Sequence, residues 1–162
     1  MTKRRPSIID TATVVERRGN ILIAKRRQRT PQIVTAAVIE KSGNILIAKR
    51  RQGSKFAGKW EFPGGKLEKG ETPEQCLKRE LQEELTITVN IGELICSSLY
   101  SYTPELTINL LAYRTTVISG TFNLNDHEEI RWVKPIDLTN YDFPEADRPI
   151  LEILMKEVCH NV

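Results

Sequence analysis

One stretch joins a glycine turn to a helix whose start is marked by several residues: GGKLEKGETPEQCLKRELQEEL, residues 64–85. Thr72 suits the N-cap of that helix, and Pro73 suits its first position. Apolar side chains then recur three or four residues apart, at Cys76, Leu77, Leu81 and Leu85. This spacing predicts an amphipathic helix that packs on the core through one stripe.

Three glutamates, Glu80, Glu83 and Glu84, project from one side of the same helix. Like charges at this spacing cost roughly 0.2–0.5 kcal/mol per pair in an isolated helix, so something should compensate. Grouped carboxylate oxygens suit Mg²⁺ or Mn²⁺, which bridge to substrate phosphates. A solvated acidic face is the alternative, but the adjoining Gly64–Gly65 turn can bring backbone close to a ligand and favours a metal site.

A longer pattern runs from Gly65 through Glu71 to Arg79–Ile87, with five and then seven residues between its parts. It resembles the Nudix box, GX5EX7REUXEEXGU, in which U is aliphatic. Every specified position matches except the late Gly, which is Thr86. Gly would ease a left-handed turn there, so the departure concerns local backbone geometry rather than metal binding. The flanking stretch FPGGKLEKGETPEQ and the tail DFPEADRPILEIL further resemble the MutT-like branch, which hydrolyses nucleoside triphosphates, oxidised ones included. The resemblance covers about residues 33–157.

The resemblance implies roles for the matching positions. The implied metal ligands are Glu80, Glu83, Glu84 and the Gly64 carbonyl. Arg79 and Glu71 would form the pair that orients the helix. The family also takes an acid from a later loop as base or metal ligand, and Glu128 is the candidate, ahead of Glu129 and Asp126. An acid in a polar loop with no catalytic role is the alternative for Glu128.

Substrate contacts follow from the same resemblance. Arg50 and Lys66 lie where the MutT-like branch contacts phosphates, although Arg50 also suits the wet face of a strand. Asp147 precedes the last helix, where this branch contacts the nucleobase; its carboxylate would accept hydrogen bonds from a donating base edge unless it is protonated. Asp147 is equally suited to be a helix N-cap. Three aromatic residues could stack on a base or belong to the core: Tyr100, Tyr102 and Phe143.

The remaining elements predict an α+β fold, with strands at 60–62, 87–103, 105–117 and 129–134 and an amphipathic helix at the C-terminal end. That helix should bury Ile150, Leu151, Leu154 and Val158. Under the resemblance this is the α/β/α sandwich with a mixed sheet, over residues 33–162.

A tandem duplication precedes this domain. Residues 11–28 and 35–52 agree at 14 of 18 positions, and GNILIAKRRQ occurs in both. Each copy predicts a hairpin, and two copies are too few for a solenoid. Only the second copy leads into the glycine turn by a short link. We therefore expect residues 1–32 to hold an appended hairpin, with exchange into a second copy of the chain or competition for one place as alternatives. The chain would be a monomer or homodimer.

Composition supports one globular domain of 162 residues, 40% of them hydrophobic. Residues 1–59 hold 15 Lys and Arg against 3 Asp and Glu, whereas residues 60–162 hold 9 against 18. The basic part lacks interleaved aromatic residues, which disfavours a nucleic-acid-binding protein. Three widely spaced cysteines, with no apolar run for a membrane span or signal peptide, lead us to expect a cytoplasmic protein with reduced thiols.

Together these features predict a Mg²⁺-dependent enzyme that hydrolyses a nucleoside triphosphate, such as an oxidised purine or a cytidine nucleotide. Water deprotonated by Glu83 or Glu128 would attack phosphorus, with Glu80 and Arg79 in the catalytic group, to give a nucleoside monophosphate and pyrophosphate. Hydrolysis of another compound linked to a nucleoside diphosphate and a catalytically silent nucleotide-binding module are the alternatives.

Overall fold

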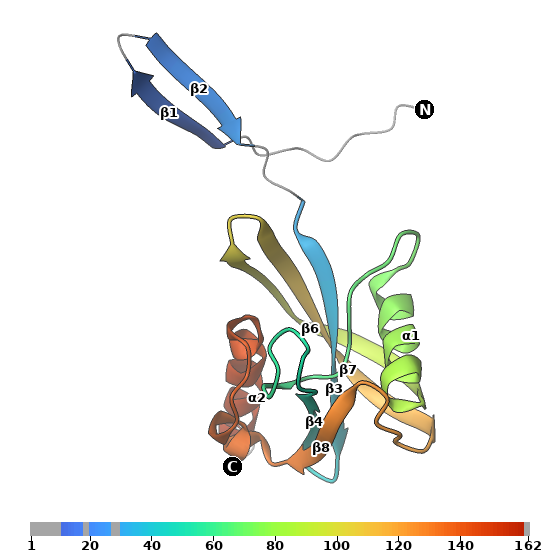
Figure 1. Ribbon diagram of the computed structural model, residues 1–162. Coiled ribbons are helices and arrows are strands. Elements are labelled where there is room, and N and C mark those ends of the chain that lie inside the picture. Colours follow the sequence, from blue (N-terminus) through green and yellow to red (C-terminus); the bar gives the residue numbers. More distant parts are fainter. Residues whose placement is uncertain (1–10, 18–19, 27–29, 161–162) are drawn as a thin grey trace.

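The computed structural model describes residues 11–17, 20–26 and 30–160, and its elements are shown in Figure 1. In these residues the strands are β1 (Thr11–Arg17), β2 (Asn20–Arg26), β3 (Gln32–Lys41), β4 (Asn44–Arg50), β5 (Trp60–Glu61), β6 (Ile87–Thr103), β7 (Leu106–Gly120) and β8 (His127–Val133). The helices are α1 (Pro73–Leu85) and α2 (Arg148–His160), with the 3₁₀ turns η1 (Pro135–Asn140) and η2 (Glu145–Asp147) between β8 and α2. No helix among them is long and apolar enough to cross a membrane.

The main sheet has the strand order β5-β4-β3-β7-β6, with β8 paired to β4. β3 and β7 run parallel, from Gln32 opposite Ile108 to Ile39 opposite Thr115, whereas the other pairs in this sheet are antiparallel. The sheet is therefore mixed, as the sequence predicted.

Both faces of this sheet are covered, since β3 and β4 each have consecutive buried residues, which point alternately to the two faces. Ala36 and Val38 belong to a core cluster that includes Ile150 and Leu154 of α2. Their neighbours in β3 belong to a second cluster with three leucines of α1: Leu77, Leu81 and Leu85. The two long helices lie on opposite sides of the sheet in Figure 1, and the predicted α+β sandwich is confirmed.

Local signals determine the ends of α1. Thr72 is the N-cap and forms a capping box with Gln75, with Pro73 at the start of the helix. The helix ends at Thr86, whose φ of 58° and ψ of 37° are left-handed. Thr86 thus adopts the conformation for which the motif's usual Gly is suited, and its N–H is bonded to the carbonyls of Leu81 and Gln82.

The duplicated sequence takes two different arrangements. β1 and β2 pair along their whole length, from Thr11 opposite Arg26 to Arg17 opposite Asn20, in a two-stranded sheet of their own. β3 and β4 pair only next to their turn, at Glu40–Ile45 and Lys41–Asn44, and then diverge to β7 and to β5 and β8. The predicted turn of the first copy, residues 18–19, lies outside the described residues, as do residues 1–10 and 27–29.

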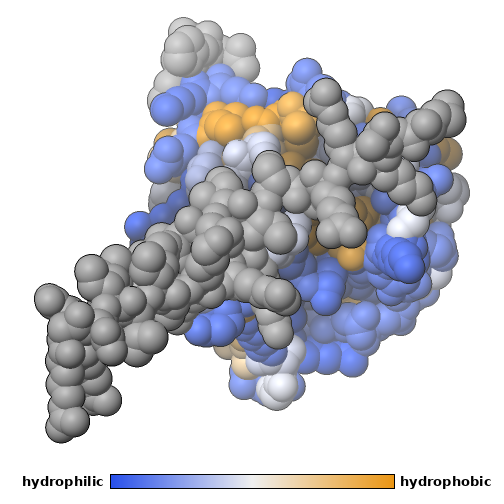
Figure 2. All heavy atoms as spheres, turned by 90° about the horizontal axis from the view of Figure 1, so that it is seen from above, coloured by the Kyte–Doolittle hydropathy of each residue, from blue (hydrophilic) through white to orange (hydrophobic). Residues whose placement is uncertain are grey.

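The surface seen from above is mostly hydrophilic where the residues are described, with apolar areas among them (Figure 2). In α2, Ile150 and Leu154 are buried as predicted, whereas Leu151 and Val158 are half-buried. The sequence did not predict η1 and η2, which bring the chain from β8 to the start of α2.

Candidate active site

The turn between β5 and α1 is clamped onto β3 by backbone hydrogen bonds. The Thr35 N–H donates to the Gly65 carbonyl at 2.7 Å, and the Ala37 N–H donates to the Pro63 carbonyl at 2.8 Å. A Cβ on Gly64, whose φ is +150°, would lie 2.2 Å from the Thr35 oxygen, and one on Gly65 would lie 2.2 Å from the Glu80 carboxyl carbon. The two glycines therefore let β3, the turn and the acidic side of α1 meet without space between them.

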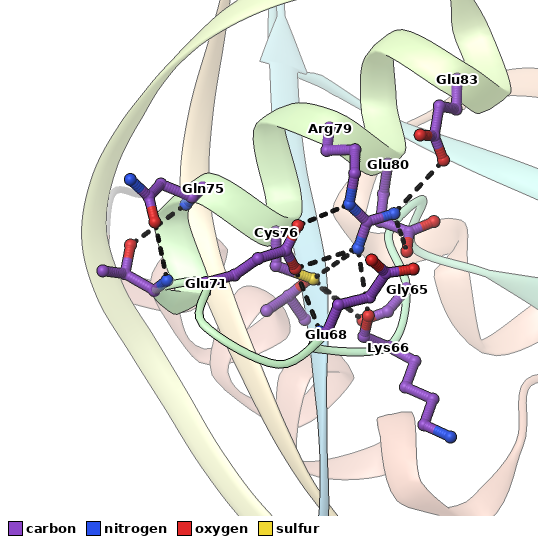
Figure 3. Close-up of polar contacts among 11 residues, drawn as sticks. Gly65, Lys66, Glu68, Glu71, Gln75, Cys76, Arg79, Glu80 and Glu83 are labelled. Atoms are coloured by element: carbon purple, nitrogen blue, oxygen red, sulfur yellow. Dashed lines mark hydrogen bonds and ion pairs between the residues drawn. The ribbon is translucent and has the colours of Figure 1, made fainter.

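Arg79 holds this arrangement together (Figure 3). Its Nε and Nη2 donate to the two oxygens of Glu71 at 2.6 and 3.0 Å, and its Nη1 donates to Glu80 at 2.8 Å and to Glu83 at 3.2 Å. Nη2 also reaches the Lys66 carbonyl at 3.3 Å. The hydrogen bond from Arg79 is the main reason that the pKa of Glu71 falls to about 2. The predicted pairing of Arg79 with Glu71 is present and ties α1 to the loop before it.

The three glutamates of α1 have different environments. Glu83 has a side chain that is 58% exposed, whereas that of Glu80 is 16% exposed. Glu84 turns toward the glycine turn and accepts a hydrogen bond from the Gly64 N–H at 3.3 Å. Burial raises the pKa of Glu84 to about 9, with added repulsion from Glu61, Glu80 and Asp126. Burial also raises the pKa of Glu80.

The part of the chain that the structure describes holds no ready group of three His, Cys, Asp or Glu side chains around one metal position. The donor set nevertheless suits a hard divalent cation, because carboxylates from one helix crowd together beside a backbone turn. Burial and, after it, the charges of neighbouring acids raise the pKa of Glu84, and a cation beside these carboxylates would favour their ionised forms.

A cleft of about 420 Å³ lies beside this group. One end is lined by the glycine turn and acidic side of α1: Gly64, Gly65, Lys66, Glu80 and Glu84. The other end is lined by aromatic, apolar and acidic residues, among them Phe56, Phe62, Tyr102, Ala146 and Asp147. Its volume is in the range of small-molecule sites. A hollow of about 490 Å³ between the β3–β4 turn and α2 contains none of the predicted site residues in its lining.

Asp147 is only 7% exposed and lines the apolar end of the cleft. Burial, helped by the charge of Glu61 and opposed by Arg50, raises its pKa to about 8. Its carboxyl group forms no hydrogen bond to another residue described in the structure, so it does not act as the N-cap of α2. The pKa of Tyr102 rises to about 12, because of burial and then the nearby Asp147 charge.

Arg50 lines the cleft, but its guanidinium is already bound within the protein. Nη1 donates to both Glu61 oxygens, at 2.9 and 2.7 Å, and Nε donates to the Lys55 carbonyl at 2.6 Å. Glu61 is also 2.9 Å from His127 Nε2, whose residue is 2% exposed. Arg50 thus forms an internal ion pair with Glu61 on the neighbouring strand, and its phosphate contact stays a prediction. Lys66 keeps an exposed side chain at the cleft.

Glu128 forms no hydrogen bond or ion pair with the glutamates of α1 among the described residues. Its carboxylate is 3.7 Å from Lys49 Nζ, and it lines a separate hollow with Arg51 and Gln52. Neighbouring side chains on β8 point to opposite faces, and His127 occupies the inward direction. Asp126 is the loop acid that affects Glu84. Glu129 is held by Arg131.

Asp126 is positioned by the residue before it. Asn125 Nδ2 donates to the Glu83 carbonyl at 2.6 Å, and the Asn125 N–H donates to the Glu84 carbonyl at 3.0 Å. These bonds fasten the loop before β8 to the C-terminal end of α1. The bonds of Asn125 therefore hold the neighbouring Asp126 close enough for its charge to help raise the pKa of Glu84.

The aromatic candidates separate into lining and core. Tyr102 lines the cleft and packs against Tyr100 at 4.8 Å between ring centroids. Phe143 is buried in the core and stacks on Phe62 at 5.2 Å. Phe56, which the sequence analysis missed, lines the cleft and lies 4.9 Å from the Tyr102 ring. Its signal was a lone aromatic side chain in the polar, glycine-containing run QGSKFAGK.

Comparison with known proteins gives the family. A family model for the NUDIX domain matches residues 29–154. A CTP pyrophosphohydrolase of Escherichia coli is 39% identical over 144 residues, covering 89% of this chain and 88% of that protein. An 8-oxo-dGTP diphosphatase of Haemophilus influenzae is 38% identical over 109 residues, covering 67% of this chain and 79% of that protein. The crystal structure of a MutT protein from Methanosarcina mazei superposes with a TM-score of 0.71 at 25% identity, covering 82% of this chain and 98% of that one.

The chain therefore belongs to the Nudix family. Members of this family generally need a divalent metal ion. The site described above occupies the family's box, residues 65–87, together with the strands that surround it.

Proposed function

We propose that this protein hydrolyses a nucleoside triphosphate to a nucleoside monophosphate and pyrophosphate, as an enzyme of nucleotide-pool sanitisation in the cytoplasm. The observation that carries the proposal is one cleft with an acidic end beside the glycine turn and an apolar end at the buried Asp147, whose carboxyl group has no hydrogen-bond partner among the described residues. Phosphates with a cation suit the first end, and a nucleobase suits the second. The names of the two relatives, which act on CTP and 8-oxo-dGTP, support this assignment. Cys76 and Cys96 are free, which agrees with a reducing compartment.

We assign Mg²⁺, with Mn²⁺ as a substitute, to the acidic end, held by Glu80, Glu83, Glu84 and the Gly64 carbonyl. When bound, such an ion neutralises phosphate charge and lowers the pKa of water. Arg79 orients Glu80 and Glu83, and Glu71 fixes Arg79 in turn. Lys66, at the mouth of the cleft, would bind phosphate as a mobile positive charge.

For the chemical step, we assign removal of the water proton to Glu83 or to the acid of the later loop. The water oxygen would bond to the β-phosphorus, in line with the oxygen that bridges the α- and β-phosphorus atoms. The bond from the β-phosphorus to this bridging oxygen would break, which releases the monophosphate. We assign the later-loop role to Asp126 rather than to Glu128. The charge of Asp126 helps to raise the pKa of Glu84, whereas Glu128 is paired with Lys49.

At the other end, we assign the base edge to Asp147 and a base contact to Tyr102. With its pKa raised to about 8, Asp147 is mainly protonated at neutral pH and offers both a donor and an acceptor. A base edge with an adjacent donor and acceptor would satisfy both. Cytosine and oxidised guanine each present such an edge.

The test is a kinetic panel of unmodified and oxidised nucleoside triphosphates with Mg²⁺, reported as kcat/KM together with the identity of both products. We expect pyrophosphate and a monophosphate, with a preference of at least about tenfold among bases. Release of inorganic phosphate, or no turnover of any triphosphate, would contradict the proposal. A nucleotide sugar and a dinucleotide in the same panel test the alternative substrate class, and nucleotide binding without turnover would indicate a silent module.

A further inference from the structure

The loop between β4 and β5, residues 51–59, borders the cleft and has no role in the function proposed above. It consists of tight turns, in which the Ala57 N–H donates to the Ser54 carbonyl at 3.2 Å and the Lys59 N–H donates to the Phe56 carbonyl at 3.1 Å. Gly53 and Gly58 have φ of +84° and +77°. The loop is thus bounded by residues that allow sharp changes of direction.

Phe56 has an unusual backbone for its type. Its φ of +61° lies in the left-handed region, which bulky side chains rarely adopt. The result of this conformation is a half-buried ring that lines the cleft and contacts Tyr102. Lys55 Nζ lies over both rings, 5.2 Å from that of Phe56 and 5.6 Å from that of Tyr102. Strained backbone conformations of this kind cluster at sites that bind ligands.

The loop is fastened to the sheet through Arg50. The guanidinium binds the Lys55 carbonyl, the residue before Phe56, and also both oxygens of Glu61. Glu61 is held in turn by the buried His127. The backbone adds two bonds, from the Arg50 N–H to the Lys59 carbonyl at 3.0 Å and from the Gly58 N–H to the Arg50 carbonyl at 3.1 Å. The ring of Phe56 is therefore held at the cleft by contacts that reach the centre of the sheet.

We propose that Phe56 is a specificity-determining residue whose ring stacks on the nucleobase while Asp147 binds the edge of that base. Both side chains line the cleft, and Tyr102 links them, because its ring contacts Phe56 and the charge of Asp147 helps to raise its pKa. A base does not fit between Phe56 and Tyr102, because their centroids are 4.9 Å apart and two stacking distances require about 7 Å. The base therefore stacks on the Phe56 ring from the cleft, beside Tyr102, which also lines the cleft. This inference rests on the proposed function, since it needs a substrate with a base.

The test separates the ring from its backbone. Phe56→Gly keeps a residue suited to the left-handed φ and removes the ring, whereas Phe56→Tyr keeps a ring. Using the full chain and the best triphosphate of the panel, we expect Phe56→Gly to raise KM at least about tenfold with kcat within about twofold, and Phe56→Tyr to resemble the wild type. Phe122→Gly is the control, because Phe122 is also half-buried and packs on another aromatic residue, Trp132, outside the cleft.

Product inhibition gives the decisive reading. The Ki of the nucleoside monophosphate, which carries the base, should rise about tenfold in Phe56→Gly, while that of pyrophosphate stays unchanged. Equal Ki values for the monophosphate in variant and wild type, with normal turnover, would overturn the inference alone. If the wild type hydrolyses no triphosphate, the proposed function fails and the inference with it. Should Phe56→Gly not fold, Phe56→Leu, which keeps volume without an aromatic face, takes its place with the same expected direction.

Discussion

Among single residues, Asp147 stands apart. It is buried, it lines the cleft, and its carboxyl group has no hydrogen-bond partner among the described residues. Its folded-state pKa of about 8 exceeds its ordinary value of 3.8, so the folded protein favours the protonated form. The contribution of this raised pKa to the free energy of unfolding is fully present below about pH 4 and is lost as the pH rises through about 8. Deprotonation leaves an uncompensated charge in an apolar place.

We therefore predict that Asp147→Asn flattens the pH dependence of stability. Between pH 5 and pH 8 the free energy of unfolding of the wild type should fall more steeply than that of the variant, by up to about 1.4 kcal/mol per pH unit. Urea unfolding at each pH measures this difference. Asp142→Asn is the control, since the Asp142 side chain is 74% exposed. Parallel curves for wild type and Asp147→Asn would show that the carboxyl titrates normally.

Glu83 is exposed and touches only Arg79 through its side chain among the described contacts. Glu83→Gln should thus leave the melting temperature within about 2 °C of the wild type, while kcat falls below about a tenth because the carboxylate charge is lost. Glu74→Gln, an exposed change in the first turn of α1, should alter neither quantity. A Glu83→Gln enzyme with more than a tenth of normal activity would remove Glu83 from the catalytic group.

The choice between the two acids near β8 can be tested directly. Asp126→Asn should lower kcat at least about tenfold, because Asp126 belongs to the acidic group around Glu84. Glu128→Gln breaks only a partly exposed ion pair with Lys49 and should change kcat less than about twofold. Steady-state kinetics of both variants under saturating Mg²⁺ decides the matter, and the reverse order of effects would restore Glu128.

At the scale of elements, α1 ends in a threonine where the family's box has glycine. The left-handed φ of 58° costs a β-branched residue more than glycine, although glycine loses more chain entropy on folding. Thr86→Gly should therefore raise the free energy of unfolding by about 0.5–1 kcal/mol without changing kcat/KM. Thermal and urea unfolding measure the gain. Thr86→Ala keeps the left-handed strain and should not raise the free energy of unfolding. A rise in that variant would contradict the explanation.

Elements with local signals were predictable from the sequence. The N-cap, proline and apolar stripe determine where α1 begins and which side it buries, and the structure has the helix at Pro73–Leu85. The resemblance to the family's box likewise implied the pairing of Arg79 with Glu71, which the structure has. Such features depend on residues a few positions apart, so the sequence contains them directly.

Other features depend on partners far along the chain, and the sequence could not supply them. Arg50 and Glu61 meet because β4 and β5 are neighbours, and His127 joins them from β8. Glu128 and Asp126 are two residues apart, and only the contact between Asn125 and α1 separates their surroundings. Phe56 reaches the cleft through a backbone conformation that no propensity predicts for phenylalanine.

For the whole molecule, we expect the first copy of the duplicated segment to be additional to the sandwich. β1 and β2 belong to a sheet of their own, and the cleft is lined by residues from Gln32 onward. Deleting residues 9–32 removes one repeat unit and puts Ile8 in the place of Gln32 at the start of β3. The shortened protein should keep kcat/KM within about twofold, as measured on the best triphosphate. Loss of soluble, active enzyme would mean that the first copy is part of the working fold.

The parallel pairing of β3 with β7 has a further consequence for the order in which the chain folds. Closing the loop from Gln32 to Ile108 involves about 76 residues, and the same step from the first copy would involve about 100, a difference in loop entropy of only about 0.2 kcal/mol. Loop closure thus hardly distinguishes two segments of nearly the same sequence. The choice must come from the chain that follows each copy, because only the second continues through residues 51–59 into β5 and so completes the sheet with the strands next to it. Which copy pairs with β7 is in this sense selected by connectivity rather than by composition.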